Sequence, residues 1–150
     1  VRVCGDTPVV AAGAMMSAQQ VCAAMMLGAC GAQLGSLLLR SEESAWPLSL
    51  KDQIPWCDDT ATRLSDVGTG RATRLIPTGI IEALSQAGLA VSSYPGQLRV
   101  LAPIFAEAIA QNRADLLEMA LGQAAQTAPK GATCAIVTKL FNDLKDCWSE

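Results

Sequence analysis

The stretch PVVAAGAMMSAQQVCAAMMLGACGAQLGS, residues 8–36, decides the fold of this chain. Its first part, Pro8 to Ala12, is a short apolar run with two valines at its centre, and it ends at Gly13. Such a run is typical of a β-strand that is buried on both faces in a parallel sheet. A second short run, residues 30–34, has the same character and closes at Gly35-Ser36. We therefore expect two strands, one at each end of the stretch.

The segment between these two runs predicts a helix. Ser17 stands at an N-cap position before residues 18–27, where Val21, Ala24 and Met25 share one helical face. Gly28 is placed to end this helix. Strand, helix and strand within about 30 residues form a βαβ unit, which requires two parallel strands.

The rest of the chain predicts mainly helices. Residues 40–75 are polar and irregular, and amphipathic patterns predict helices over about 78–88, 98–109, 114–126 and 133–148. In the last of these, we expect Ile136, Val137, Leu140, Phe141 and Leu144 to face inward. The sequence thus divides into a βαβ segment, residues 1–40, and a mainly helical segment, residues 41–150. Two strands are too few for a parallel sheet that is stable by itself, so we expect neighbouring strands from upstream chain or from another subunit.

Composition narrows the classes of function. The chain has 150 residues, 51% of them hydrophobic, a formal net charge of −3 and no histidine. An acidic balance makes nucleic acid an unsuitable partner. No run of about 20 uninterrupted apolar residues predicts a membrane span. The lack of histidine removes the commonest metal ligand and the commonest general base.

The cysteine pattern argues against a zinc site. The six cysteines are scattered, with no CxxC pair: Cys4, Cys22, Cys30, Cys57, Cys134 and Cys147. Three disulfides are the alternative, but a chain this apolar does not require them, and no signal peptide opens the sequence. We expect reduced thiols in a cytoplasmic protein.

The two glycine turns carry the chemistry. In a parallel sheet, Gly13-Ala14 and Gly35-Ser36 lie at the same edge, where each strand ends. Backbone N–H groups there favour an anion, and glycine lets a phosphate approach the backbone. On these residues alone, plain tight turns remain the alternative.

The motifs around these turns resemble those of a known family. PVVAAGA, residues 8–14, and LGACGAQLGS, residues 27–36, are similar to the PVIAAGGI and LGADGVQMGT patterns of the nitronate monooxygenases, formerly called 2-nitropropane dioxygenases. The resemblance continues through four later segments: Ser41 to Ala45, Thr69 to Ala72 (compare SGRPA), Tyr94 to Gln97 (YPxQ) and Leu121 to Ala125 (AGQ). Flavin-dependent enoyl-ACP reductases share most of these motifs.

The resemblance implies an FMN-dependent (β/α)₈ TIM barrel, with this chain as its last βαβ unit and a helical C-terminal segment. It places the FMN phosphate and ribityl end on the backbone of Gly13, Ala14, Gln33, Leu34, Gly35 and Ser36. It places Tyr94 and Gln123 near the flavin or the small-molecule substrate. It gives Arg71 a structural role, tying loop carbonyls or a carboxylate. The implied reaction oxidises an alkyl nitronate with O₂ to a carbonyl compound and nitrite.

This sequence departs from the family pattern in three places. Ala14 replaces a second glycine, and its Cβ would approach a phosphate oxygen. Residues 17–20 replace a glycine-containing helix start. The family's catalytic histidine belongs to a GGH segment upstream of these strands, so the catalytic residue of this chain is unknown. Two alternatives stay open: an enoyl-ACP reductase, and a truncated non-catalytic chain that binds no flavin.

Asp58 and Asp59 form an adjacent carboxylate pair that invites a metal or acid–base interpretation. Thr60 follows them, and a solvated loop or a helix cap is the favoured interpretation of the three residues. We expect no metal here.

Overall fold

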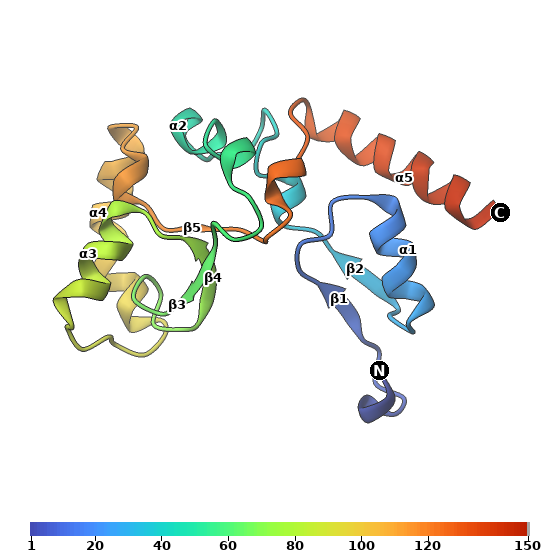
Figure 1. Ribbon diagram of the computed structural model, residues 1–150, viewed down its shortest axis with the longest axis horizontal. Coiled ribbons are helices and arrows are strands. Elements are labelled where there is room, and N and C mark those ends of the chain that lie inside the picture. The colour runs from blue at the N-terminus through green and yellow to red at the C-terminus, as the bar shows by residue number, and fades with distance from the viewer. Residues whose placement is uncertain (150) are drawn as a thin grey trace. The chain divides into compact units, whose positions relative to one another are not determined.

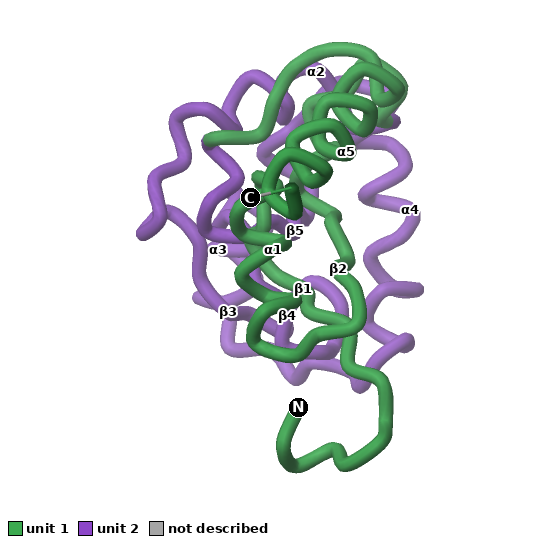
Figure 2. The backbone as a smooth tube through the Cα atoms, turned by 90° about the vertical axis from the view of Figure 1, so that its right-hand side faces the viewer, with its two compact units in different colours: residues 1–44, 127–150 green, residues 45–126 purple. Residues whose placement is uncertain are grey.

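The computed structural model describes residues 1–149, which form two compact units (Figures 1 and 2). Unit 1 comprises residues 1–44 together with residues 127–150, of which residues up to 149 are described. Unit 2 comprises residues 45–126. The final helix therefore lies in the same unit as the βαβ segment. The sequence analysis instead placed it in one mainly helical segment, residues 41–150. Each unit has its own core.

Unit 1 contains the predicted βαβ arrangement. Strand β1, Val10–Ala12, pairs in parallel with β2, Gly31–Gln33, and helix α1, Ala18–Met26, connects them. The register sets Ala11 opposite Ala32. Gly28 follows the end of α1 with a φ of +101°, a conformation that side chains disfavour. The predicted parallel βαβ unit is thus confirmed.

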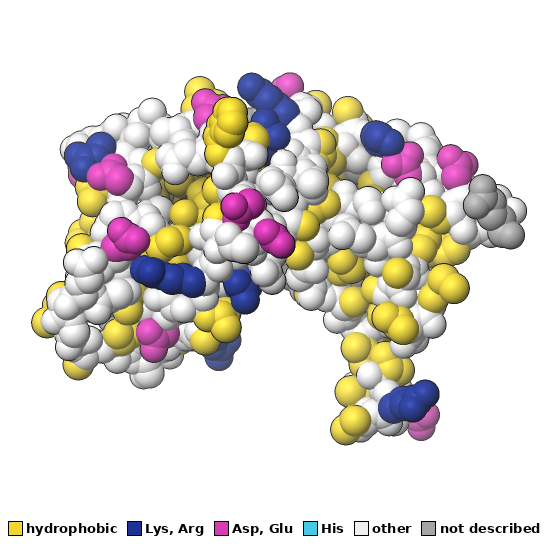
Figure 3. Space-filling view, in the orientation of Figure 1, with side chains coloured by type: hydrophobic (Ala, Val, Ile, Leu, Met, Phe, Trp, Pro, Cys, Tyr) yellow, Lys and Arg dark blue, Asp and Glu magenta, His cyan; other side chains and the backbone are white. Residues whose placement is uncertain are grey.

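The expectation that these strands are buried on both faces is wrong for the described chain. Val10 is 56% exposed, and Gln33 at the end of β2 is also exposed. Residues 1–149 contribute only β1 and β2 to this sheet, so neither strand has a second neighbour to cover it. Figure 3 shows hydrophobic side chains at the surface of the β1–α1–β2 segment, and Met26 and Leu27 are among the exposed residues there.

Helix α5, Thr133–Ser149, packs against α1 and closes the core of unit 1. Ala18, Val21 and Cys22 of α1 are buried together with Leu144 of α5. Ile136 is also buried, as the sequence predicts, and Leu140 packs against the same cluster. Phe141 does not face inward: it is 59% exposed.

A carboxylate caps the beginning of α5. One side-chain oxygen of Glu43 accepts hydrogen bonds from the backbone N–H of Thr133, at 2.8 Å, and from its hydroxyl, at 2.7 Å. The first N–H groups of a helix have no partner within the helix, and the helix dipole favours a negative charge there. The acidic segment after β2 therefore holds the final helix in place.

Replacing Glu43 with alanine is expected to lower the free energy of unfolding by about 1 kcal/mol, because α5 loses its N-terminal acceptor. Urea denaturation followed by circular dichroism measures this change. The neighbouring Glu42 is exposed and serves as the control. Equal losses in Glu43→Ala and Glu42→Ala would show that the cap does not stabilise the unit.

Unit 2 is built on a three-stranded antiparallel sheet. Its strands are β3, Arg63–Ser65, β4, Thr73–Ile76, and β5, Met119–Ala120, in the order β3-β4-β5. Its helices are α2, Leu48–Lys51, α3, Gly79–Ala87, and α4, Gly96–Ala110. Six fully buried side chains form its core: Leu50, Ile54, Leu75, Ile81, Leu117 and Met119.

The sheet of unit 2 corrects two predictions. Residues 40–75 are not simply irregular, since they contain α2, β3 and part of β4. The helix predicted over 114–126 is absent from this part of the described chain, where a 3₁₀ turn, Ala114–Leu116, precedes β5. Leu117, Met119 and Leu121 are buried and Ala120 is exposed, as in a strand with one face on the core, although Glu118 is buried as well. The predicted helices α3 and α4 are confirmed.

Among residues 1–149, no helix combines the length and the apolar character that crossing a membrane requires.

Candidate functional site

The parallel pairing of β1 and β2 brings the two glycine turns together. Ala12 and Gln33 are register partners at the ends of the strands, so Gly13-Ala14 and Leu34-Gly35 continue from the same edge of the sheet. Neighbouring strands lie about 4.8 Å apart, so the two turns are side by side. The six residues predicted to bind the cofactor therefore all lie at or just beyond this edge of the sheet of unit 1.

Both glycines leave open space above the backbone. A Cβ atom built at Gly13 or at Gly35 would meet no atom within 4 Å. Gly13 has a φ of +116°, which only glycine adopts readily, whereas the backbone of Gly35 suits any residue. The space that a side chain would fill is therefore open at both turns.

Ala14 continues the turn in a left-handed conformation, with a φ of 52°. A residue with a Cβ pays about 1 kcal/mol or more for this conformation, so the turn is held by its surroundings rather than by preference. The side chain is half-buried, and the backbone N–H is retained. Replacing the family's second glycine thus preserves the turn.

The N-terminus of α1 caps itself. The Ser17 hydroxyl accepts a hydrogen bond from the backbone N–H of Gln20, and the Gln20 side-chain oxygen accepts from the N–H groups of Met16, at 2.6 Å, and Ser17, at 3.2 Å. This is a complete capping box. The N–H groups of Met16, Ser17 and Gln20 thus already have acceptors and are not available to an anion at this edge. Residues 17–20, which replace a glycine-containing helix start, thus begin α1 with a capping box.

The second turn presents backbone rather than side chains. Leu34 packs its side chain against the core cluster of unit 1, while Gly35 is exposed. Ser36 begins a short 3₁₀ helix, η2, Ser36–Leu38. The groups that Leu34 and Gly35 can offer to a ligand are therefore their peptide N–H and C=O groups.

The other two predicted site residues, Tyr94 and Gln123, belong to unit 2. Tyr94 is half-exposed, and its peptide bond to Pro95 is cis. The Gln123 side-chain amide donates a hydrogen bond to the backbone oxygen of Asp59 at 3.0 Å. Tyr94 and Gln123 thus lie in a different unit from the two glycine turns.

Arg71 has a different partner from the one expected. Its guanidinium lies over the ring of Tyr94, 4.9 Å from the centroid, rather than on a loop carbonyl or a carboxylate. A cation over an aromatic face is a favourable contact of about 0.5–1 kcal/mol at exposed sites. Arg71 thus orders the exposed loops on which it and Tyr94 lie.

The acidic pair forms a solvated turn. One Asp58 oxygen accepts hydrogen bonds from the backbone N–H of Thr60, at 2.8 Å, and from its hydroxyl, at 2.7 Å. The hydrogen bond from the Thr60 hydroxyl is the main cause that lowers the pKa of Asp58. No group of three or more potential ligand side chains within residues 1–149 has metal-binding geometry.

Glu118 is a buried carboxylate that the sequence reading missed. It directly precedes β5, is 9% exposed, and packs against Gly68, where an added Cβ would lie 2.7 Å from the carboxyl carbon. Burial raises the pKa of Glu118 above its ordinary value. The local sequence does not mark Glu118 as buried, because between Leu117 and Met119 it stands at the position that a strand period turns away from the core.

Replacing Glu118 with glutamine is expected to stabilise the protein at about pH 7 but not at about pH 4. The raised pKa means that the folded state holds the proton more tightly than the unfolded state. The free energy of unfolding of the wild type therefore falls as the pH rises from 4.5 through the raised pKa. Urea denaturation of both proteins across this range measures the difference.

Glu107 on α4 is exposed and provides the matched control for this prediction. Glu107→Gln is expected to keep the wild-type dependence of stability on pH. An unchanged pH dependence in Glu118→Gln would mean that burial of this carboxyl has no energetic consequence.

These features define a class of protein. A parallel βαβ unit with two open glycine turns at the carboxyl edge of its strands is an α/β arrangement suited to a phosphate group, as in nucleotide- and flavin-binding enzymes. The family model described as nitronate monooxygenase matches residues 1–143. The chain belongs to the nitronate monooxygenase family, as the sequence motifs predict.

Individual relatives agree with this assignment. The chain is 31% identical over 137 residues to a probable nitronate monooxygenase of Staphylococcus haemolyticus (strain JCSC1435), covering 91% of this chain and 37% of that protein. It is 30% identical to a probable nitronate monooxygenase of Staphylococcus aureus (strain Newman), covering 91% and 39%. The chain thus spans less than two fifths of the length of these curated relatives.

Solved structures share the fold. A nitroalkane oxidase from Streptomyces ansochromogenes superposes with a TM-score of 0.84 at 28% identity, covering 99% of this chain and 42% of that chain. FabK from Thermotoga maritima superposes with a TM-score of 0.74 at 20% identity, covering 96% and 46%. At this identity, the FabK match shows a common fold only.

Proposed function

We propose that this chain contributes the phosphate-binding edge of an FMN-dependent oxidoreductase that oxidises alkyl nitronates with O₂ to a carbonyl compound and nitrite. In this proposal, its βαβ unit is the last of a (β/α)₈ barrel, and the protein is cytoplasmic. The observation that carries the proposal is the pairing of β1 with β2, which sets the turns after both strands side by side. Family membership supports the reaction class.

The residues present fit the phosphate end of FMN. Gly13 and Gly35 leave open space beside the backbone at both turns. The backbone of Gly13-Ala14 would hold one side of the phosphate, and the run from Gln33 to Ser36 would hold the other side and the ribityl end. Tyr94 and Gln123 would contact flavin or substrate.

When bound, FMN supplies the oxidation–reduction chemistry, and the protein orients and shields it. In this proposal, the residues of this chain bind the cofactor and position it. Its capping box fixes the start of α1, and its left-handed Ala14 fixes the path of the first turn, so the peptide groups of the site are set before a ligand arrives.

Titration of the purified chain with FMN tests the proposal. We expect saturable quenching of flavin fluorescence and a rise in melting temperature with FMN concentration, because a ligand that binds only the folded state stabilises it. A chain that neither binds FMN nor gains thermal stability would instead be a non-catalytic chain, and the proposal would fail.

Two assays on the same protein separate the enzyme classes. Nitronate-dependent O₂ uptake is expected for the proposed reaction. NAD(P)H-dependent reduction of an enoyl thioester, without O₂ uptake, would favour an enoyl-ACP reductase, the alternative with which this chain shares motifs.

A further inference from the structure

Two cysteines lie at the contact between the helices that form the core of unit 1. Cys22 of α1 is buried in the core cluster, and Cys147 of α5 is half-buried and packs against the same cluster. Both are thiols in this structure. The proposed binding of FMN uses neither of them. Their placement on two facing helices raises the possibility of a covalent link between the helices.

Both cysteines lie on the stripes by which the two helices face each other. On α1, four side chains that form or contact the cluster are spaced three, four and seven residues apart: Ala18, Val21, Cys22 and Met25. On α5, the corresponding side chains are spaced four and seven residues apart: Leu140, Leu144 and Cys147. Such spacing places residues on one face of a helix. Each cysteine therefore belongs to the face that its helix turns towards the other.

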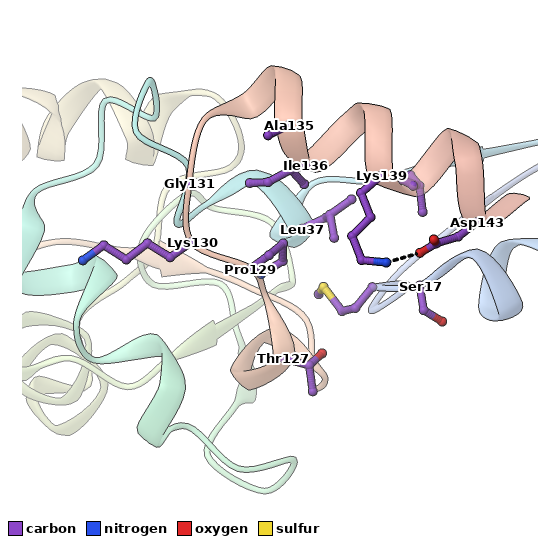
Figure 4. Close-up of a pocket in the computed structure, with 12 residues that line it drawn as sticks. Ser17, Leu37, Thr127, Pro129, Lys130, Gly131, Ala135, Ile136, Lys139 and Asp143 are labelled. Carbon is purple, nitrogen blue, oxygen red and sulfur yellow. Dashed lines mark hydrogen bonds and ion pairs between the residues drawn. The ribbon is translucent and has the colours of Figure 1, made fainter.

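The order of contacts along the two helices brings the cysteines level with each other. A cavity of about 440 Å³ is lined by Ser17, the N-cap of α1, and by Lys139 and Asp143 in the middle of α5 (Figure 4). The beginning of α1 thus lies beside the middle of α5. Both helices continue from there towards their C-terminal ends, and each cysteine lies between one and two turns further along its helix.

The spacing of packed helices suits a disulfide at this contact. Helix axes pack about 8–10 Å apart, and small side chains allow the closer approach. Because each Cα atom lies about 2.3 Å from its axis, Cα atoms that face each other directly are about 3.4–5.4 Å apart. A disulfide joins Cα atoms that are about 4.4–6.8 Å apart, so the two ranges overlap. Ala18 and Cys22 are the small residues on the α1 side of the contact.

We infer that Cys22 and Cys147 form a disulfide under oxidising conditions and that this bond fastens α5 to α1. The oxidant is a low-molecular-weight disulfide. The more accessible Cys147 thiolate attacks one of its sulfurs, which forms a mixed disulfide and releases one thiolate. The Cys22 thiolate then attacks the Cys147 sulfur and releases the second thiolate. The protein loses two protons and two electrons, and the oxidant is reduced to two thiols.

The bond adds a redox-dependent fastening to the contacts already described. Under reducing conditions, α5 is held by its packing on α1 and by the Glu43 cap. Under oxidising conditions, the disulfide closes a long loop of chain and so removes conformations from the unfolded state. The inference goes beyond the proposed function, and no step of it uses the flavin.

Oxidation of a full-length variant that keeps only these two cysteines tests the inference. The other four are replaced with serine and lie outside the core cluster of unit 1: Cys4, Cys30, Cys57 and Cys134. After treatment with oxidised glutathione, we expect the intact mass to fall by two hydrogen atoms and both sites of alkylation by N-ethylmaleimide to be lost. The oxidised protein is expected to melt about 5 °C or more above the reduced protein.

The matched control keeps Cys22 and Cys134 instead. Cys134 is also on α5, but it is exposed and lies in the first turn, about 20 Å before Cys147 along the helix axis. We expect this variant to gain the mass of glutathione rather than to close an internal disulfide. In the wild-type chain, Cys22→Ser and Cys147→Ser should each abolish the rise in melting temperature on oxidation, whereas Cys134→Ser should leave it unchanged.

Three results would overturn the inference. The first is that the variant with Cys22 and Cys147 keeps both thiols or stops at a mixed disulfide with glutathione. The second is that the variant with Cys22 and Cys134 closes an internal disulfide to the same extent. The third is that the oxidised protein melts no higher than the reduced protein, which would mean that the bond does not fasten α5.

Discussion

Replacing Gly35 with aspartate is expected to weaken FMN binding by about a hundredfold, because a like charge placed against the phosphate costs several kcal/mol. Gly35 is exposed, its backbone conformation suits any residue, and an added Cβ would meet no atom within 4 Å. The substitution therefore changes the charge of the proposed site without disturbing the fold. Fluorescence titration with FMN measures the affinity.

Gly35→Asn is the matched control for this prediction. Asparagine has the shape of aspartate and can also accept hydrogen bonds from nearby N–H groups, but it carries no charge. We expect Gly35→Asn to retain most of the FMN affinity. Riboflavin, which has no phosphate, should bind both variants equally. A similar loss of FMN affinity in both variants would show that the effect is steric and that the phosphate does not lie at this turn.

Replacing Gly70 with alanine is expected to lower the free energy of unfolding by roughly 3 kcal/mol or more, which is the range of severe backbone and packing defects. Gly70 has a φ of +82°, and its carbonyl accepts a hydrogen bond from the N–H of Tyr94 at 3.2 Å. A Cβ at this position would overlap the Ser92 carbonyl oxygen and lie 2.8 Å from the Tyr94 nitrogen. The clash is with backbone, so no side-chain rotation relieves it.

Gly88→Ala separates the clash from the backbone conformation. Gly88 ends α3 with a φ of +61°, but a Cβ there meets no atom within 4 Å. This variant pays only the left-handed penalty, about 1 kcal/mol. Urea denaturation followed by tryptophan fluorescence compares the two proteins. Equal destabilisation would mean that the contact between the loops of Gly70 and Tyr94 relaxes at no cost.

Local patterns predict those elements whose signals lie within a few residues. The capping Ser17 and the glycine Gly28 bound α1 correctly, and the apolar run before Gly13 locates β1. Gly88 likewise marks the end of α3. In each case, the cap or the left-handed glycine acts through its immediate neighbours, so the sequence contains the whole cause.

Local sequence patterns do not predict strands whose pairing partners are distant in the sequence. β4 pairs with β5 more than forty residues later, with Leu75 opposite Ala120. The run that includes Leu117 and Met119 has enough apolar residues for a helical interpretation, and only the partner strand makes its alternation decisive. The buried Glu118 escapes notice for the same reason, because its environment comes from Gly68 in a different loop.

The sequence by itself determined the parallel βαβ unit, its two glycine turns and membership of the nitronate monooxygenase family. Only the tertiary structure decided that α5 packs on α1, that Glu43 caps α5 and that a cavity lies beside them. The physical reason is the separation along the chain between the residues that interact. Turns and caps act between residues close in the chain, whereas packing and burial depend on segments that meet only after the chain has folded.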